Sequence, residues 1–241
     1  MKKNLVDLHT HSVASNHAFS SATENFEYAA SIGLKVYGLS EHQTDTFGVG
    51  ANPLVFGGLW DNAPKQIGDT KILIGIEANV TDEGIDLLLP KTFNKFSYLI
   101  ASMHSYVYDP NKHDYDSNTK NYLNVMDNKD VKILGHIDDG YFPCDYEQVV
   151  KKAKDKHILI EINNSSLKPN GFRLNSRENY KTVLSLCEKY DCPIIMNSDA
   201  HIKYKIGNLE YSQQLLDEVN FPDRLVLNYD LALFEKYFTY R

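Results

Sequence analysis

The chain has 241 residues, which is long enough for one large α/β domain and requires no second domain. Apolar residues make up 42% of the chain and charged residues 24%, a composition typical of globular proteins that argues against extended disorder. The net charge of -7 argues against broad affinity for long nucleic acids or anionic membranes. Three cysteines without a C-x-x-C pair argue against a disulfide framework.

The N-terminal sequence "MKKNLVDLHTH" contains two lysines but lacks the apolar segment of a signal peptide. No window of the sequence reaches the ~18 consecutive apolar residues of a membrane span. We therefore predict a cytoplasmic protein that does not associate with membranes.

Seven short apolar runs recur along the chain, each with the length and β-branched content of a buried strand. They cover residues 4–9, 35–40, 72–80, 97–104, 132–136, 158–164 and 193–199. Amphipathic stretches lie between several of them, at residues 23–32, 117–126, 145–154 and 176–190. In the first stretch, Thr23 is the expected N-cap and Gly33 the expected stop.

This alternation of strand and helix predicts parallel strands joined by crossover helices. Seven such units favour a barrel over an open sheet, with residues 1–241 forming a single domain. Three connections, at residues 43–70, 105–116 and 165–175, are longer or less regular than a plain crossover. Because ordered long loops are often functional, we expect them to surround the mouth of a pocket.

Histidine and acidic residues gather at one end of the predicted strands. Nine of them lie at or just beyond the carboxyl end of a strand, where α/β enzymes assemble their sites. These are His9, His11, His17, His42, Glu77, His104, His136, Asp199 and His201. Chance would scatter such residues along both ends of the strands and along the helices. Imidazoles and carboxylates converging on one rim therefore predict a metal centre.

The local spacing supports this prediction. In "DLHTH" the alternation of a strand turns Asp7, His9 and His11 to the same side, so both imidazoles can reach one ion. Nine ligands are too many for one ion and suit three ions that keep open positions for water. Glu77 interrupts an otherwise apolar strand, where a lone carboxylate is costly and divalent cations would stabilise it. We expect Glu77 to bridge two ions.

An ordered set of short motifs along nearly the whole chain resembles the PHP superfamily, named for polymerase and histidinol phosphatase. The motifs are "DLHTH", "SEH", "GIEAN", "ASMH", "GH", "EINNSS" and "SDAH". The set as a whole is specific, although a piece such as "GH" alone is not. The stand-alone bacterial phosphatases of the small, trinuclear type are the most similar branch.

The resemblance implies a distorted seven-stranded (βα)7 barrel that resembles a TIM barrel, with a trinuclear metal site at the carboxyl ends of the strands. Zinc is the expected metal, with manganese or iron as alternatives. By motif position, one ion would be held by His9, His11, Glu77 and Asp199, a second by His17, His42 and His201, and the third by Glu77, His104 and His136. All nine positions carry residues able to bind metal.

The charge of such a centre points to the chemistry. Three divalent ions with two carboxylates keep roughly +4, which attracts a dianion and hydroxide. We therefore predict a phosphatase in which a hydroxide bridging the metals attacks a small-molecule phosphomonoester in line. Glu77, Asp199 and His201 are the expected catalytic residues, and no dedicated general acid is visible. Asp7 and Glu41 could each orient an imidazole of the site. The alternative is a buried hydrogen-bonded acid for Asp7 and a surface charge for Glu41.

Substrate contacts are predicted from the segment after the sixth strand. Arg173 and Arg177 could grip a phosphate, or could equally be solvent-exposed. Asn163 and Ser165 are suited to hydrogen bonding with the substrate. In the long second connection, Phe56 and Trp60 could cover the pocket or pack beneath it.

Other functions remain open from the sequence. A histidinol-phosphate phosphatase, and a phosphodiesterase or nuclease acting on a nucleotide end, could use the same metals. The alternative that is not an enzyme is a regulatory protein that binds metal without catalysing a reaction. The expected partner is a small phosphate ester rather than a membrane or a long nucleic acid, and the oligomeric state is left open.

Overall fold

The computed structural model describes residues 3–44, 46, 48–85, 87 and 95–239. Within these residues, eight strands form one sheet, in which seven run parallel in the order β1-β2-β4-β5-β6-β7-β8. The short strand β3 (Gln66–Ile67) pairs antiparallel with β4 off this path. The seven are β1 (Val6–Asp7), β2 (Val36–His42), β4 (Thr70–Asn79), β5 (Tyr98–Ser102), β6 (Val131–Leu134), β7 (Leu159–Asn163) and β8 (Ile194–Asn197).

The two ends of this path meet, so the sheet is nearly closed. Thr10 and Ala200 form a parallel bridge between the segments that follow β1 and β8. The backbone N–H of Leu8 also donates to the side-chain oxygen of Asn197 at 2.9 Å. The predicted barrel of seven parallel strands is confirmed.

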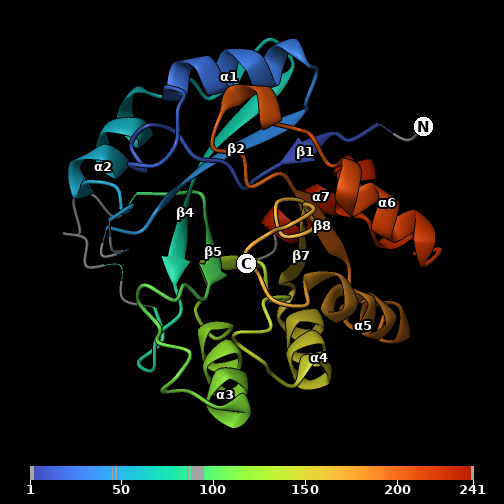
Figure 1. Ribbon diagram of the computed structural model, residues 1–241. Coiled ribbons are helices and arrows are strands. Elements are labelled where there is room, and N and C mark those ends of the chain that lie inside the picture. The colour runs from blue at the N-terminus through green and yellow to red at the C-terminus, as the bar shows by residue number, and fades with distance from the viewer. Residues whose placement is uncertain (1–2, 45, 47, 86, 88–94, 240–241) are drawn as a thin grey trace.

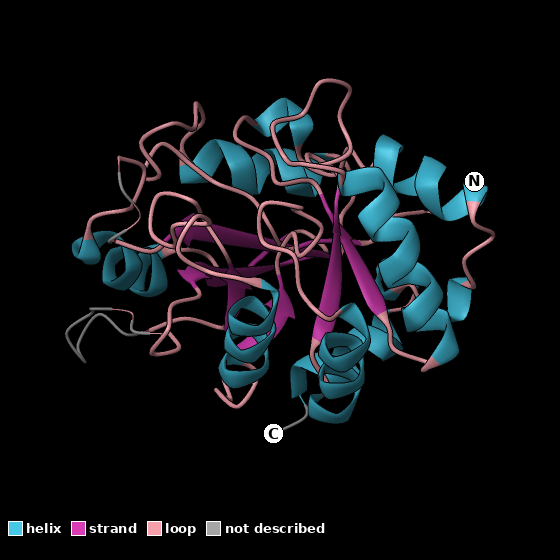
Figure 2. Cartoon of the chain, turned by 60° about the horizontal axis from the view of Figure 1, so that its bottom comes forward, coloured by secondary structure: helices cyan, strands magenta, loops and turns pink. Residues whose placement is uncertain are grey.

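Seven α-helices surround the strands within the described residues (Figures 1 and 2). They are α1 (Ala22–Ser31), α2 (Pro53–Asn62), α3 (Tyr115–Val125), α4 (Tyr146–Lys156), α5 (Ser176–Lys189), α6 (Glu210–Glu218) and α7 (Leu231–Thr239). Three short 3-10 helices, η1 (Lys203–Lys205), η2 (Asp223–Leu225) and η3 (Leu227–Tyr229), follow β8. No helix in this part of the chain has both the length and the apolar content needed to cross a membrane. The cytoplasmic location and the single domain of residues 1–241 stay predictions.

The predicted start of the first helix is wrong. Ser21, not Thr23, is the N-cap, because the Ser21 side chain accepts from the Glu24 N–H while the Glu24 carboxylate accepts from the Ser21 N–H. This reciprocal pair is a capping box. Gly33 lies just past the helix at φ 77°, a left-handed conformation that glycine adopts without strain.

Helix α2 lies inside the connection at residues 43–70, for which the sequence predicts only a segment longer or less regular than a plain crossover. Asn52 caps it by accepting from the Leu54 N–H, and Pro53 occupies its first turn, where no N–H is needed. Two central glycines weaken the helical pattern in the sequence, which is why this helix was missed.

An apolar cluster fills one end of the structure. It combines buried residues of six of the parallel strands with the last helix: Val6, Val36, Tyr98, Ile133, Leu159, Ile195 and Phe234 are among its members. The Tyr98 ring leaves no room for a side chain at Gly75, where an added Cβ would lie 2.4 Å from the ring. Because this end is packed with apolar side chains, the polar residues of the strands gather at the other end.

Candidate metal centre

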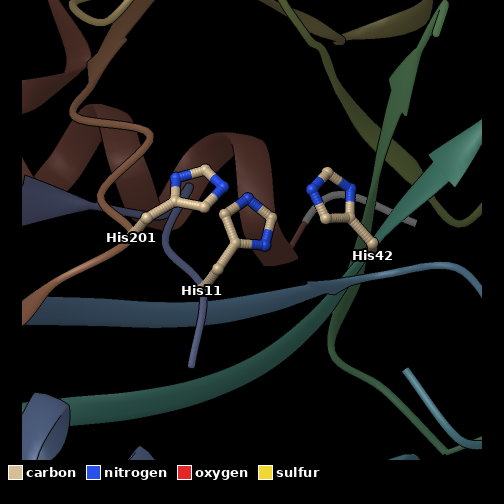
Figure 3. Close-up of side chains that lie close together, drawn as sticks. All are labelled: His11, His42 and His201. Atoms are coloured by element: carbon tan, nitrogen blue, oxygen red, sulfur yellow. The ribbon is translucent and has the colours of Figure 1, made fainter. Parts of the chain in front are cut away.

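The structure brings all nine predicted ligand residues together where the strands end. His9 and His11 follow β1, Glu77 lies on β4, and Asp199 follows β8. The ring centroid of His11 is 4.3 Å from that of His42 and 4.6 Å from that of His201, so that His11 lies between them (Figure 3). Residues separated by up to about 190 positions in the chain thus share one site.

Glu77 occupies the centre of this cluster. Its carboxylate is buried and has five imidazole nitrogens within 3.5 Å. The nitrogen-to-oxygen distances are 2.8 Å for His42, 3.0 Å for His136, 3.1 Å for His104, 3.2 Å for His9 and 3.5 Å for His11. Burial alone would raise the pKa of Glu77, but electrostatic attraction to the His9, His104 and His42 rings outweighs burial and holds it well below its usual value. Glu77 therefore remains ionised.

Three groups of ligand atoms lie close enough together to hold a metal ion. His11, His42 and His201 form one such group, and His9, His11 and Asp199 form a second. His42, Glu77 and His104 form a third, and the ligand atoms within each group lie within 4.8 Å of one another. The Nε2 atoms of His17 and His201 also face each other at 2.6 Å.

Several buried atoms of this cluster have no hydrogen-bond partner among the described residues. They are Nε2 of His9, both ring nitrogens of His11, Nδ1 of His42 and Oε2 of Glu77. The last two atoms are only 2.8 Å apart, yet their geometry does not fit a hydrogen bond. Because buried polar atoms are nearly always satisfied, these atoms are suited to binding cations.

The protonation states also suit metal binding. Burial lowers the pKa of His17 and of His104 to about 4, and it lowers the pKa of His11 well below the usual value. Burial would raise the pKa of Asp199, but the neighbouring His9 and His11 rings, with His11 Nε2 at 3.5 Å from Oδ1, hold it well below its usual value. Neutral imidazoles and ionised carboxylates are the forms that ligate a divalent ion. His9 is the exception, because the carboxylates of Glu161, Glu77 and Asp199 outweigh its burial and raise its pKa well above the usual value.

Two of the nine residues have a strained backbone. His136 has φ 28° and Asp199 has φ 51°, both in the left-handed region that residues with a side chain rarely adopt. The backbone N–H of His136 donates to Oε2 of Glu161 at 2.8 Å, which holds this conformation in place. Strain of this kind concentrates at functional sites.

Glu161 on β7 is a site residue that the sequence reasoning missed. Its buried carboxylate accepts from Nδ1 of His9 at 2.7 Å, which turns Nε2 of that ring toward Glu77. It also accepts from the side-chain amides of Asn163 and Asn197. The available signal was a carboxylate within an apolar strand, the same signal that singled out Glu77.

Asp7 and Glu41 hold loops rather than imidazoles. Asp7 accepts from the Ser198 hydroxyl at 2.6 Å and from the Gly207 N–H at 2.8 Å, and burial raises its pKa to about 6. Glu41 is fully buried rather than a surface charge, and it accepts from the N–H and hydroxyl groups of Ser12 and Ser15. These bonds shape the segment that carries His17.

A cavity of about 410 Å³ opens above the cluster, with seven of the nine residues in its lining. Those seven are His17, His42, Glu77, His104, His136, Asp199 and His201. Ser165 and Arg173 also line it, and Arg173 reaches Oδ2 of Asp199 at 3.5 Å. The carboxyl ends of the strands thus form the floor of an accessible pocket.

Neither of the other two predicted substrate residues, Asn163 and Arg177, lines the cavity. Asn163 is buried and donates to both Glu161 and Asp199. Arg177 lies on α5, outside the lining of this cavity, and pairs with Glu218. Phe56 is buried in the core, and Trp60 packs against a separate apolar cluster, so neither lines the pocket.

Known proteins are similar to this chain over most of its length. The sequence profile of the PHP domain matches residues 7–166. A probable phosphatase of Clostridium acetobutylicum is 39% identical over 229 residues, which cover 95% of this chain and 91% of that protein. The chain belongs to the PHP domain family. The predicted family is therefore confirmed.

Other relatives of this PHP domain protein carry similar names. A probable phosphatase of Clostridium novyi is 40% identical, with the same coverage of both chains. The expected enzyme class, a phosphatase, is confirmed by these relatives. The fold matches a crystal structure of histidinol phosphate phosphatase from Lactococcus lactis complexed with zinc, L-histidinol and phosphate. That match has a TM-score of 0.64 and 18% identity, and covers 91% of this chain and 95% of the other.

Proposed function

We propose that this PHP domain protein hydrolyses a small-molecule phosphomonoester at a centre of three divalent metal ions. The observation that carries the proposal is the set of buried nitrogen and oxygen atoms around Glu77 that find no hydrogen-bond partner in the part of the chain that the structure describes. They converge beneath an open cavity, where a substrate would reach them. The names of the curated relatives support the reaction class.

The proposed ligand sets are those implied by the family resemblance, with Glu77 shared between two ions. His9, His11, Glu77 and Asp199 would hold one ion, and His17, His42 and His201 a second. Glu77, His104 and His136 would hold the third. Zinc is the favoured metal because imidazole nitrogen dominates the donor set, and the Lactococcus lactis structure contains zinc. Manganese or iron are the alternatives.

When bound, the ions would supply the Lewis acidity that yields a hydroxide nucleophile near neutral pH and offsets the charge of the phosphate. Residues of the chain orient the imidazole rings that would hold the ions. Glu161 fixes the tautomer of His9 by accepting from its Nδ1, and Asn79 does the same for His104 at 2.9 Å. Both rings then direct Nε2 toward Glu77.

Arg173 would bind a phosphate oxygen of the substrate. Its side chain is 6% exposed, and one nitrogen donates to the Ser166 hydroxyl at 2.8 Å. Guanidinium groups carry five donors in a rigid fork, so further donors remain for a phosphate at the cavity floor. Ser165, also in the lining, would add a hydroxyl contact. Arg177 is left out of the proposed site.

The test is phosphate release by protein reconstituted with zinc or manganese, with a chelated sample as the control. The substrates would be p-nitrophenyl phosphate, a panel of metabolite monoesters that includes histidinol phosphate, and a phosphodiester. We expect metal-dependent release from monoesters and at least tenfold slower cleavage of the diester. Faster cleavage of the diester would replace the proposal with a phosphodiesterase. No release by fully metallated protein would replace it with a metal-binding regulator.

A further inference from the structure

The wall of the cavity carries aromatic side chains, whereas its floor carries the histidines and carboxylates of the candidate metal centre. Three large aromatic side chains in the lining are exposed: Tyr106 at 69%, Tyr141 at 51% and Phe172 at 78%. They come from three different connections, after β5, β6 and β7. Aromatic residues from separate loops that surround one opening form an apolar surface of the kind that marks a ligand site.

The inner part of the wall is also apolar. Val49, Met103 and Phe142 line the same cavity. Among the described lining residues, Arg173 is the only lysine or arginine, and it lies at the floor against Asp199. The Asp139 carboxylate in the wall accepts from the Tyr141 and Leu174 N–H groups, so one of its oxygens is engaged in holding the loop.

This distribution divides the pocket into two parts. If phosphate binds at the floor, as the proposed function requires, the organic part of the ester must extend along the aromatic wall. Aromatic rings bind flat apolar groups by stacking and by removing apolar surface from water. The volume of about 410 Å³ leaves room for a ring beside the phosphate.

We propose that the substrates of this site are phosphomonoesters whose leaving alcohol carries an apolar ring, bound against Tyr106, Tyr141 and Phe172. This inference rests on the proposed phosphatase function and adds the class of leaving group. The ring contacts raise kcat/KM for such esters over esters of small hydrophilic alcohols.

The test compares benzyl phosphate with glycerol phosphate, using the protein reconstituted with zinc. Both esters release an alcohol rather than a phenol, which limits the difference in their intrinsic reactivity. We expect kcat/KM to be at least tenfold higher for benzyl phosphate. Equal values, or a preference for glycerol phosphate, would overturn the inference and leave the phosphatase function intact.

Two single variants test whether the wall causes the preference. Tyr106→Ala and Phe172→Ala should each lower the ratio of the two kcat/KM values about three- to tenfold, the range of one lost aromatic contact. The Arg173 guanidinium lies 4.9 Å from the Phe172 ring centroid, so Tyr106→Ala is the variant that leaves this contact in place. An unchanged ratio in both variants would contradict the role of the wall.

Tyr204→Ala is the matched control. Tyr204 is 65% exposed on η1 and lies outside the cavity lining, so its removal should leave the ratio within twofold of the wild type. Binding of benzylphosphonate and hydroxymethylphosphonate by calorimetry decides the inference without turnover. Tighter binding of benzylphosphonate that weakens in Tyr106→Ala supports the aromatic wall even if no ester is hydrolysed, whereas equal binding refutes it.

Discussion

Strands β4 and β7 each place one buried glutamate beneath the cavity, and the two glutamates are satisfied in different ways. Glu161 on β7 accepts hydrogen bonds from His9, His136, Asn163 and Asn197. Glu77 on β4 is surrounded by imidazole nitrogens, and none of the residues that the structure describes forms a hydrogen bond with its Oε2. The same residue type, equally buried, thus has a complete set of donors on one strand and an incomplete set on the other.

The difference indicates what each glutamate does. Burying a carboxylate that lacks hydrogen-bond donors costs free energy of folding. A cation bound among the imidazoles around Glu77 would offset this cost. The donors around Glu161 fix its orientation, and it in turn fixes the ring of His9. We therefore propose that Glu77 binds metal and that Glu161 positions a ligand.

The largest effect is expected from Glu77→Gln. Because two of the proposed ion sites share this carboxylate, the variant should lose bound metal and on the order of 10³-fold in kcat/KM. The measurement is metal content by mass spectrometry, in parallel with phosphate release. Glu83→Gln, at an exposed glutamate outside the cavity lining, is the control. Full metal occupancy in Glu77→Gln would contradict the bridging role.

Glu161→Gln should have a smaller effect. Glutamine keeps one acceptor oxygen but loses the charge that orients His9, so metal affinity and activity should fall about 10- to 100-fold. Titration of each metal-free variant with zinc separates the two outcomes. Excess zinc should restore activity in Glu161→Gln but not in Glu77→Gln. If Glu161→Gln lost metal irreversibly, the distinction between the two glutamates would be wrong.

Arg173→Ala should act mainly on substrate binding. Loss of a charge-assisted phosphate contact predicts an increase in KM of about 10- to 100-fold, with metal content unchanged. Lysine at this position should recover part of the loss, because it restores the charge without the fork geometry. A variant with normal KM would remove Arg173 from the site.

Arg177→Ala is expected to have the smallest effect. Arg177 is 44% exposed and pairs with Glu218 on the outer face, and such surface pairs contribute roughly 0 to 1 kcal/mol to the free energy of unfolding. Activity should remain within twofold of the wild type, as measured with the same monoester. A loss comparable to that of Arg173→Ala would show that Arg177 takes part in substrate binding.

The barrel and the positions of the nine candidate ligands could be predicted because both follow from the strand pattern. Each ligand comes at or just beyond the end of an apolar run, and parallel strands bring those ends together. Glu161 carries the same local signal as Glu77, a carboxylate in an apolar strand, but its positioning role depends on partners from other strands, such as Asn197, which the local sequence does not reveal. The different positions of Arg173 and Arg177 depend on where α5 begins, and the aromatic wall depends on three loops meeting.

The number of zinc ions bound per chain tests the central claim most directly. Protein freed of metal with a chelator and then reconstituted should bind three zinc ions per chain, measured by mass spectrometry after removal of excess metal. Its melting temperature should rise with occupancy, because ions that bind the folded state more tightly than the unfolded state stabilise the fold. A folded chain that retains no zinc, or that takes up zinc equally well without Glu77, would contradict the account.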